Sequence, residues 1–401
     1  MNQERIQTLQ AIYRDGLLSD TLPFWIPRCV DHEHGGFIMS MDRTGQIVDT
    51  DKGVWQQGRF TWLLGELFNN VLDVEDAQRQ QWLELAKHGA DFLDRHCFDS
   101  TDGRMWFHVT RDGQPIRKRR YSFTESFAAI AYGELAKATG DESFAVKAKN
   151  AFQQFIDYNI DPASRGIQPK FTDVRPMRGI GFPMITIVTA QELRESISLP
   201  EADKWIDRSI DAIREFHLKP EIECVMESVG PNGEMIDHFD GRTLNPGHAI
   251  EGAWFIMLEG KTRGDQSLIE TGLQMLDWMW KRGWDQEHGG LLYFVDVKGL
   301  PVQEYWHDMK FWWPHNEAII ATLLAYQLTS DSKYAGWHQQ VHDWTYKFFP
   351  DPDHGEWFGY LHRDGSVSSP LKGNLWKGPF HMPRMQLVCW KLLEEMASTA
   401  S

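Results

Sequence analysis

The sequence predicts an all-α protein, an (α/α)6 barrel of six helical hairpins with short β pieces in the turns at one end. Three observations lead to this prediction. A phrase of Asp, polar residues, Gly and aromatics recurs along the chain, and the segments between its copies have helical periodicity. Those segments are of two kinds, one apolar on nearly all sides and one amphipathic, as an inner and an outer ring of helices require.

The recurring phrase sets the size of the repeat. Its copies begin at Asp31, Asp99, Asp161, Asp285 and Asp351, with separations of 68, 62, 124 and 66 residues. Since 124 is twice 62, a degenerate copy is expected near residue 223, just before the turn-rich segment 230–233. Six units of about 67 residues then account for the whole chain. No linker rich in Pro, Gly or Ser divides it, so we expect a single catalytic domain over residues 1–401.

Between the copies, the two kinds of helix are distinct. Segments 82–93, 144–152 and 268–276 place apolar residues every three or four positions, which is typical of a helix with one buried face. Segments 127–132 and 318–324 are apolar on nearly all sides, and such helices are buried. We therefore expect each unit to contribute one outer and one inner helix.

Charge and aromatic content restrict the partners. The formal net charge of −16 disfavours nucleic acid and anionic membranes and favours a neutral small molecule. The chain contains 18 Trp against 23 Phe. At least half of these indoles are expected in the core, and the others suit a flat ligand such as a sugar ring.

The cysteines and the N-terminus bear on location. The four cysteines lie far apart without a CxxC motif, as expected for reduced thiols. The N-terminal stretch has no apolar signal region, and no run of about 18 apolar residues occurs. These features predict a cytoplasmic protein outside the membrane.

One candidate for acid/base chemistry opens an apolar helix. In Asn245-Pro246-Gly247-His248, Asn is a typical N-cap and Pro a typical first helical residue, which places His248 in the first turn. Glu251 follows on the same helical face. The helix dipole favours a neutral imidazole and the carboxylate favours the cation, so His248 is suited to titrate near neutrality.

A second histidine has a similar setting. His381 lies at another expected helix start, with Arg384 on the same face. Either histidine by itself is more often a core or cap residue. The pair, each with a charged neighbour at the start of an inner helix, favours general acid/base catalysis.

Other polar residues stand among aromatics. Trp55 to Arg59 and Phe311 to Glu317 place Arg59 and Glu317 beside apolar helices, where they form either a buried ion pair or part of a substrate site. The run 117–120 is a solvated face or, less expectedly, an anion or effector site. We find no P-loop and no dinucleotide-binding motif, and His32 and His34 suit a turn better than a metal.

At these residues the sequence resembles the N-acylglucosamine 2-epimerase family. The resemblance covers essentially the whole chain and rests on Asp31–Phe37, Trp55–Arg59, Thr110–Gly113, Asn245–Ala249, Trp312–His315, Glu356–Leu361 and Phe380–His381. It implies an (α/α)6 barrel and interconversion of N-acetylglucosamine and N-acetylmannosamine. It also implies that His248 and His381 are the acid/base pair, with the substrate bound by Arg59, Glu251, Glu317, Arg384, Trp55 and Trp313.

The resemblance carries further expectations. No metal or redox cofactor is expected. ATP, an effector of some members, would act through the segment 103–120, and some members are homodimers. Cellobiose 2-epimerases and aldose–ketose isomerases of the wider superfamily share an Asn-x-His-Leu-His segment. Its counterpart here, 181–185, has no His, which favours the N-acyl branch.

Three alternatives remain at this stage. The first is an epimerase or aldose–ketose isomerase acting on unsubstituted sugars such as mannose and glucose. The second is an inverting glycosidase, which needs two carboxylates about 6.5–9.5 Å apart, with Glu251 and Glu317 as the candidates. The third is a binding protein without catalytic activity.

Overall fold

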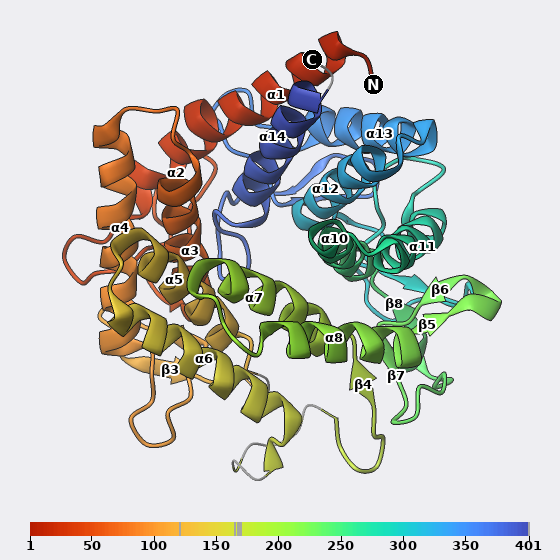
Figure 1. Cartoon of the computed structure of the whole chain (residues 1–401), viewed down its shortest axis with the longest axis horizontal. Coiled ribbons are helices and arrows are strands. Elements are labelled where there is room, and N and C mark those ends of the chain that lie inside the picture. Colours follow the sequence, from red (N-terminus) through yellow and green to blue (C-terminus); the bar gives the residue numbers. More distant parts are fainter. Residues whose placement is uncertain (120–121, 164–165, 167–170, 400–401) are drawn as a thin grey trace.

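The computed structural model describes residues 1–119, 122–163, 166 and 171–399, which form a ring of paired helices (Figure 1). The inner helices are α3 (Val54–Asn70), α5 (Thr124–Thr139), α7 (Gly181–Ile197), α10 (Pro246–Arg263), α12 (Trp312–Thr329) and α14 (His381–Thr399). The outer helices are α1 (Gln3–Asp15), α4 (Asp76–His96), α6 (Glu142–Ile160), α8 (Ala202–Ala212), α11 (Gln266–Gly283) and α13 (Ser332–Phe348). The predicted all-α (α/α)6 barrel is confirmed.

Burial separates the two rings as the sequence pattern predicts. In α12, every residue from 312 to 325 is buried, because the helix packs on neighbours all round. In α8, burial is confined to one stripe, Ala202, Ile206, Ser209 and Ile210. Burial on all sides therefore marks the inner helices, and a buried stripe with a spacing of three to four residues marks the outer ones.

The sixth hairpin differs from a simple succession of six units. Each of α3, α5, α7, α10 and α12 packs on the outer helix that follows it, whereas α14 packs on α1 from the opposite end of the chain. Figure 1 shows the two termini close together beside this pair. A π-helix, η1 (Gly16–Thr21), and α2 (Leu22–Cys29) continue from α1. The repeat thus begins with an outer helix, and the last unit is completed by the first.

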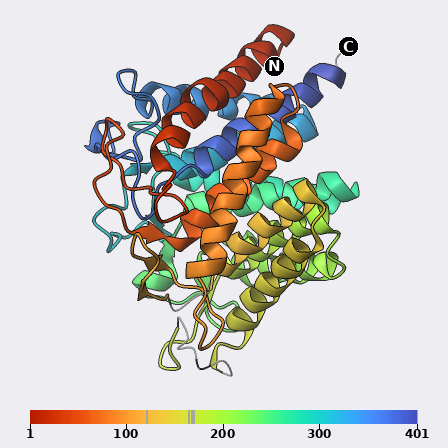
Figure 2. The same cartoon turned by 90° about the vertical axis from the view of Figure 1, so that its left-hand side faces the viewer.

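The β pieces gather at one end, as predicted, because the two kinds of connection differ in length (Figure 2). Connections from an inner to an outer helix are short, such as 140–141 and 264–265. Those from an outer to an inner helix are long and carry the strands, together with η3 (Ile213–His217), η4 (Pro220–Ile222) and α9 (Phe239–Arg242). The strand-bearing end is therefore the end at which the inner helices start.

The strands form small antiparallel sheets. Two sheets have three strands, β1 (Lys52–Gly53), β2 (His108–Val109) and β3 (Pro115–Arg117), and β10 (Lys310–Phe311), β11 (Tyr360–Leu361) and β12 (Val367–Ser369). Three further pairs join β4 (Arg178–Gly179) to β7 (Ser228–Val229), β5 (Leu218–Lys219) to β6 (Cys224–Val225), and β8 (Thr243–Leu244) to β9 (Val295–Asp296).

The recurring Asp/Gly phrase is a tight turn closed by a bridge between residues seven apart. The bridges are Val30–Phe37, Phe98–Met105, Trp284–Leu291 and Pro350–Trp357, and Leu218–Val225 supplies the copy expected near residue 223. Part of the copy at Asp161 lies outside the described residues.

A buried ion pair anchors several of these turns. Asp31 accepts hydrogen bonds from Lys52 at 2.9 Å and from Arg111 of the next unit at 2.9 Å. Burial favours the neutral acid, but the two cations outweigh it and hold the pKa of Asp31 well below its usual value. Asp285, Lys310 and Arg363 repeat this arrangement.

The third copy of this ion pair closes the ring. Asp351 binds Lys372 at 3.0 Å and receives two hydrogen bonds from Arg43, at 2.7 and 2.8 Å. The arginine again comes from the next unit around the ring, which is here the first unit of the chain. No helix in the described part of the chain is long and apolar enough to cross a membrane.

Candidate active site

The start of α10 follows the predicted capping pattern. Asn245 is the N-cap, and its side-chain oxygen accepts the backbone N–H of His248 at 3.1 Å, with Pro246 as the first helical residue. Gly247 is needed for a close approach, since a Cβ here would lie 2.8 Å from the ring of Trp313. The motif therefore brings His248 and Trp313 together.

The carboxylate beside His248 is not the one that helical spacing predicts. His248 Nδ1 lies 3.0 and 3.2 Å from the two oxygens of Glu227, in the turn between β6 and β7. Glu251, expected as its partner, instead accepts a hydrogen bond from Arg384 at 2.7 Å. Glu227 carried no motif in the sequence, because only the folding of the long connection between α8 and α10 places it here.

His381 is the first residue of α14 and is almost wholly buried. Its Nδ1 lies 2.7 Å from Glu317 Oε1, and Arg384 Nη2 lies 3.4 Å from the same nitrogen. Burial, followed by the nearby charges of Arg384 and Arg59, lowers the pKa of His381 well below its ordinary value. The imidazole is therefore neutral at physiological pH.

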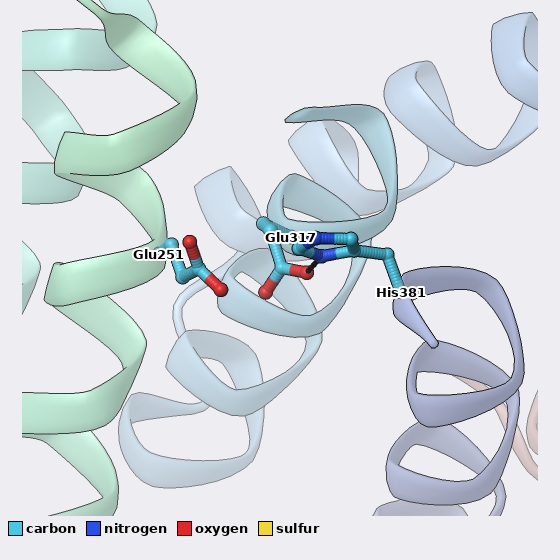
Figure 3. Close-up of side chains that lie close together, drawn as sticks. All are labelled: Glu251, Glu317 and His381. Carbon is cyan, nitrogen blue, oxygen red and sulfur yellow. Dashed lines mark hydrogen bonds and ion pairs between the residues drawn. The ribbon is translucent and has the colours of Figure 1, made fainter. Parts of the chain in front are cut away.

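Arg384 joins two acidic side chains across the barrel. Its Nη2 donates to Glu251 at 2.7 Å and to Glu317 at 2.6 Å, and Trp254 donates its indole N–H to Glu317 at 2.8 Å. Figure 3 shows Glu251 facing Glu317 and His381. A buried cluster of this kind stays charged only because its members neutralise one another.

The same cluster bears on two readings of the site. One ligand atom from each of Glu251, Glu317 and His381 lies within 4.8 Å of the others, a spacing that would suit a metal ion. The Arg384 guanidinium already bridges the two carboxylates. The separation is also shorter than the about 6.5–9.5 Å that an inverting glycosidase needs for its water, which argues against that alternative.

Arg59 enters the site through aromatic contacts. Its guanidinium lies 4.2 Å from the ring centroid of Phe127, 4.5 Å from that of Phe380 and 4.8 Å from that of Trp55. Burial lowers the pKa of Arg59 to about 9, so the group stays cationic at neutral pH. Its buried Nε has no hydrogen-bond partner among the described residues. A cation desolvated in this way is available to a negatively charged ligand.

The two tryptophans that sequence reasoning selected lie in different places. The ring of Trp313 is 5.0 Å from that of His248 and 5.7 Å from that of His381, so it stands between the two histidines. Trp55 packs on Phe107 and on the exposed Trp376 at the strand-bearing end. Trp313 thus contacts both proposed acid/base groups, and Trp55 reaches the site through Arg59.

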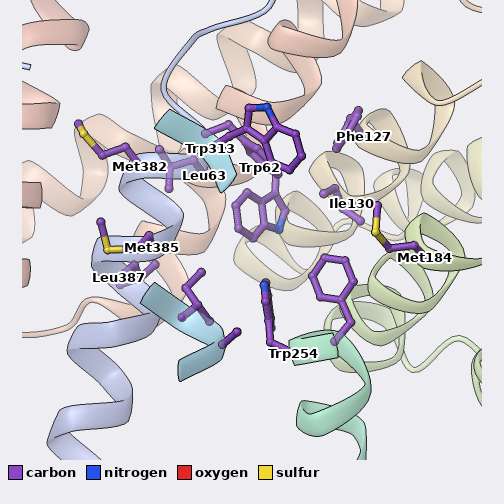
Figure 4. Packing of buried hydrophobic residues seen from close by; sticks show 14 of the residues in the cluster. Trp62, Leu63, Phe127, Ile130, Met184, Trp254, Trp313, Met382, Met385 and Leu387 are labelled. Atoms are coloured by element: carbon purple, nitrogen blue, oxygen red, sulfur yellow. The ribbon is translucent and has the colours of Figure 1, made fainter. Parts of the chain in front are cut away.

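The apolar wall of the barrel includes the segment that lacks histidine. Figure 4 shows Met184 of α7 close to Ile130, in the same cluster as Trp254 and Trp313. Met184 is buried and belongs to the 181–185 stretch. An apolar side chain therefore lies in the 181–185 segment, which is the counterpart of the Asn-x-His-Leu-His segment of the cellobiose enzymes.

His315, in the Trp312–His315 motif, has a structural role. Its Nδ1 lies 2.6 Å from the carbonyl oxygen of Phe311, and its Nε2 accepts the backbone N–H of Leu291 at 2.9 Å. Burial lowers its pKa to about 3. Both ring nitrogens therefore bind the backbone. In the first unit, the side chain of Gln57 similarly binds the backbone N–H and carbonyl of Phe37.

Comparison with known proteins identifies relatives over nearly the full length. The chain is 35% identical to the N-acylglucosamine 2-epimerase of Bos taurus over 391 residues, covering 95% of this chain and 90% of the relative. It is 34% identical to the Homo sapiens N-acylglucosamine 2-epimerase, covering 99% and 93%. Cellobiose 2-epimerase of Bacteroides fragilis is more distant, at 23% identity with 94% and 97% coverage.

Solved structures share the fold at lower identity. The cellobiose 2-epimerase of Bacillus thermoamylovorans has a TM-score of 0.81 and 19% identity, covering 97% of this chain and all of that one. A D-mannose isomerase has a TM-score of 0.78 and 17% identity, covering 97% and 98%. The profile of the N-acylglucosamine 2-epimerase (GlcNAc 2-epimerase) family matches residues 35–381. With this match and the mammalian relatives, the chain belongs to the N-acylglucosamine 2-epimerase family.

Proposed function

We propose that this protein is an isomerase that interconverts N-acetyl-D-glucosamine and N-acetyl-D-mannosamine by epimerisation at C2. The observation that carries the proposal is the placement of His248 and His381. They start two different inner helices, flank the same indole of Trp313, and each has its Nδ1 against a carboxylate. The mammalian relatives that carry the name of this activity support the choice of substrate.

The reaction needs two bases on opposite faces of one carbon. Opening of the sugar ring makes C1 an aldehyde, which acidifies the proton on C2. One histidine removes this proton and leaves an enediol(ate), and the other delivers a proton to the opposite face of C2. With its Nδ1 engaged, each imidazole has Nε2 for this transfer, and each positioned acid/base contributes about 10²–10⁴ in rate.

The charges around the site suit the intermediate. Negative charge develops on the oxygen of C1 as C2 loses its proton. Arg59 and Arg384 are both buried cations, and a fixed cation in a site with little water stabilises such an oxyanion strongly. C2 loses one proton and gains another with no net transfer of electrons, so we propose that turnover requires neither a redox cofactor nor a metal ion.

Incubation in deuterated water tests the proposal. N-Acetylmannosamine should give N-acetylglucosamine carrying deuterium at C2, and prior dialysis against a chelator should leave the rate unchanged. Mannose and cellobiose should be tested beside it. Formation of a ketose from mannose, with N-acetylmannosamine unchanged, would instead favour the isomerase acting on unsubstituted sugars.

Three finer properties belong to the same proposal. We propose a cytoplasmic protein, consistent with four buried cysteines outside any disulfide, and a homodimer, which sedimentation analysis tests. We also propose that ATP acts through the segment 103–120. Arg117 is exposed there, although Lys118 is paired with Asp99 and Asp102, and Arg120 lies outside the described residues. Titration of the protein with ATP alone tests this effect.

A further inference from the structure

Both candidate histidines hold the same nitrogen against a carboxylate. His381 Nδ1 lies 2.7 Å from Glu317, and His248 Nδ1 lies 3.0 Å from Glu227. A carboxylate at Nδ1 favours the tautomer in which Nδ1 carries the proton, so that Nε2 is the nitrogen able to accept another. The two imidazoles are therefore oriented in the same way, although Glu317 is on an inner helix and Glu227 is in a turn.

The turn that carries Glu227 is held firmly on both sides. The backbone oxygen of Glu227 accepts the N–H of Ile180 at 2.9 Å, just before α7. Met226, the residue before Glu227, is bound twice by His217. Its backbone N–H donates to the backbone oxygen of His217, and its carbonyl oxygen lies 2.8 Å from His217 Nδ1. The residue after Glu227, Ser228, is paired with Gly179 in the β4–β7 sheet. This support fixes the carboxylate relative to α10.

Glu227 differs from Glu317 in its other contacts. Glu317 is fully buried, forms an ion pair with Arg384 and accepts a hydrogen bond from the indole N–H of Trp254. The Glu227 side chain is 24% exposed and presents both oxygens to His248. Glu317 thus has a role in the charge balance of the cluster, whereas Glu227 places both of its oxygens against the His248 imidazole.

From this geometry we infer that Glu227 is the positioning residue of His248, and that it makes proton transfer at one face of the sugar depend on a carboxylate separate from the Arg384 cluster. The inference rests on the proposed epimerase function. Loss of Glu227 should therefore impair the C2 proton transfer that His248 performs and leave the transfer at His381 intact.

The two directions of the reaction separate these transfers. The C2 proton of one epimer faces His248, and that of the other faces His381. In deuterated water, substrate recovered without inversion gains deuterium when the same histidine that removed the proton returns a deuteron. The rate of this exchange can be measured for each epimer by itself.

Glu227→Gln is the decisive variant, with Glu221→Gln as its control in the neighbouring β5–β6 hairpin, where Glu221 is exposed. We expect turnover to fall by about 10²–10⁴-fold, because the imidazole loses the carboxylate that sets its tautomer and orientation. Exchange should fall for one epimer and persist for the other, so that the ratio of the two rates changes at least about 10-fold. The control should match the wild type.

Equal loss of exchange for both epimers, at an unchanged melting temperature, would overturn the inference, and so would unchanged rates. If Glu227→Gln fails to fold, Glu227→Asp retains the charge one methylene shorter. It should then give the same one-sided loss, whereas an equal loss for both epimers would again overturn the inference.

A readout that does not depend on turnover separates this inference from the proposed function. Nitrogen-15 shifts of His248 in the wild-type protein should show a protonated Nδ1, and Glu227→Gln should change the tautomer population while His381 stays the same. A wild-type protein that is inactive on N-acetylmannosamine would count against the proposed function. Identical His248 shifts in the two proteins would count against the role of Glu227.

Discussion

His248 and His381 occupy similar positions at the starts of two inner helices, yet their surroundings differ. The His381 side chain is 9% exposed and lies against Glu317 and Arg384, whereas the His248 side chain is 33% exposed and lies against Glu227. The charges around His381 form a closed network across three helices, α10, α12 and α14. Those around His248 come from a turn at the mouth of the barrel.

This difference shows how one fold can place two histidines in environments that differ in burial and in neighbouring charge. Burial and two cations keep His381 neutral, so its ring is unprotonated and can act as the base at neutral pH. His248 instead has its Nδ1 against Glu227, which lies in a turn and not on an inner helix. A reversible two-base reaction needs one histidine as base and the other as acid, and the asymmetry suits the direction in which His381 is the base.

The largest expected effect comes from removing either imidazole. His248→Asn and His381→Asn should each lower turnover by about 10²–10⁴, because each removes one acid/base. The double variant should lose little more than the worse single one, since the two act as a unit. Steady-state rates in both directions check this, with His354→Asn, at an exposed turn position, as a control. Near-normal turnover in either single variant would contradict the two-base assignment.

The next effect separates the two arginines. Arg384→Met should lower the free energy of unfolding by about 3–5 kcal/mol, because it leaves the Glu251 and Glu317 carboxylates buried without their cation. Arg59→Met should cost far less stability, since Arg59 is held by aromatic rings, but should still impair turnover. Urea unfolding and rate measurements on both variants check the contrast. Equal destabilisation would show that Arg59 is part of the same ion-pair network.

A smaller effect tests the contact between Trp313 and α10. Gly247→Ala places a methyl group 2.8 Å from the Trp313 ring and should cost about 1–3 kcal/mol through overpacking, with a loss of turnover as the indole shifts against His248. Gly336→Ala in α13 is the matched control, because a methyl group there meets no atom within 4 Å. The control should gain up to about 1 kcal/mol from helix propensity. Thermal unfolding of the two variants would reveal any departure from this order.

The smallest effect is the pH dependence that the buried His381 confers. Its pKa is lowered on folding, so below a pH of about 6.5 the unfolded chain binds a proton that the folded protein excludes. Stability is therefore lost as the pH falls, by about 1.4 kcal/mol per pH unit for this group. His381→Asn should reduce the slope by that amount between pH 6 and 5 in urea unfolding. An unchanged slope would mean that His381 is protonated in the fold.

Much of this arrangement follows from local sequence signals. The cap at Asn245, the helix start at His381 and the six-fold spacing of the Asp/Gly turns depend on neighbouring residues, and each was predictable. The two rings of helices were predictable for the same reason, from segments that are apolar on nearly all sides and segments with one apolar face. The roles of the site residues in catalysis stay predictions until the variants are measured.

The features that escaped prediction depend on distant segments. Glu227 reaches His248 only through the fold of a long connection, and helical spacing pointed to Glu251 instead. The pairing of α1 with α14 joins opposite ends of the chain, which a repeat counted from residue 31 does not reveal. His315 belongs to a motif that carries the family resemblance, and only the structure shows that its ring nitrogens bind the backbone of Phe311 and Leu291.

The Arg43–Asp351 ion pair joins the last unit of the ring to the first in the same way as neighbouring units are joined elsewhere. It joins the last turn to the first by the same contact that joins Asp31 to Arg111, and Asp285 to Arg363, within the chain. The barrel is in this sense a closed circle cut once, between α14 and α1. A circularly permuted chain that joins the present termini by a linker and opens at the short connection 330–331 should therefore build the same ring, because no contact of the circle depends on the location of the cut.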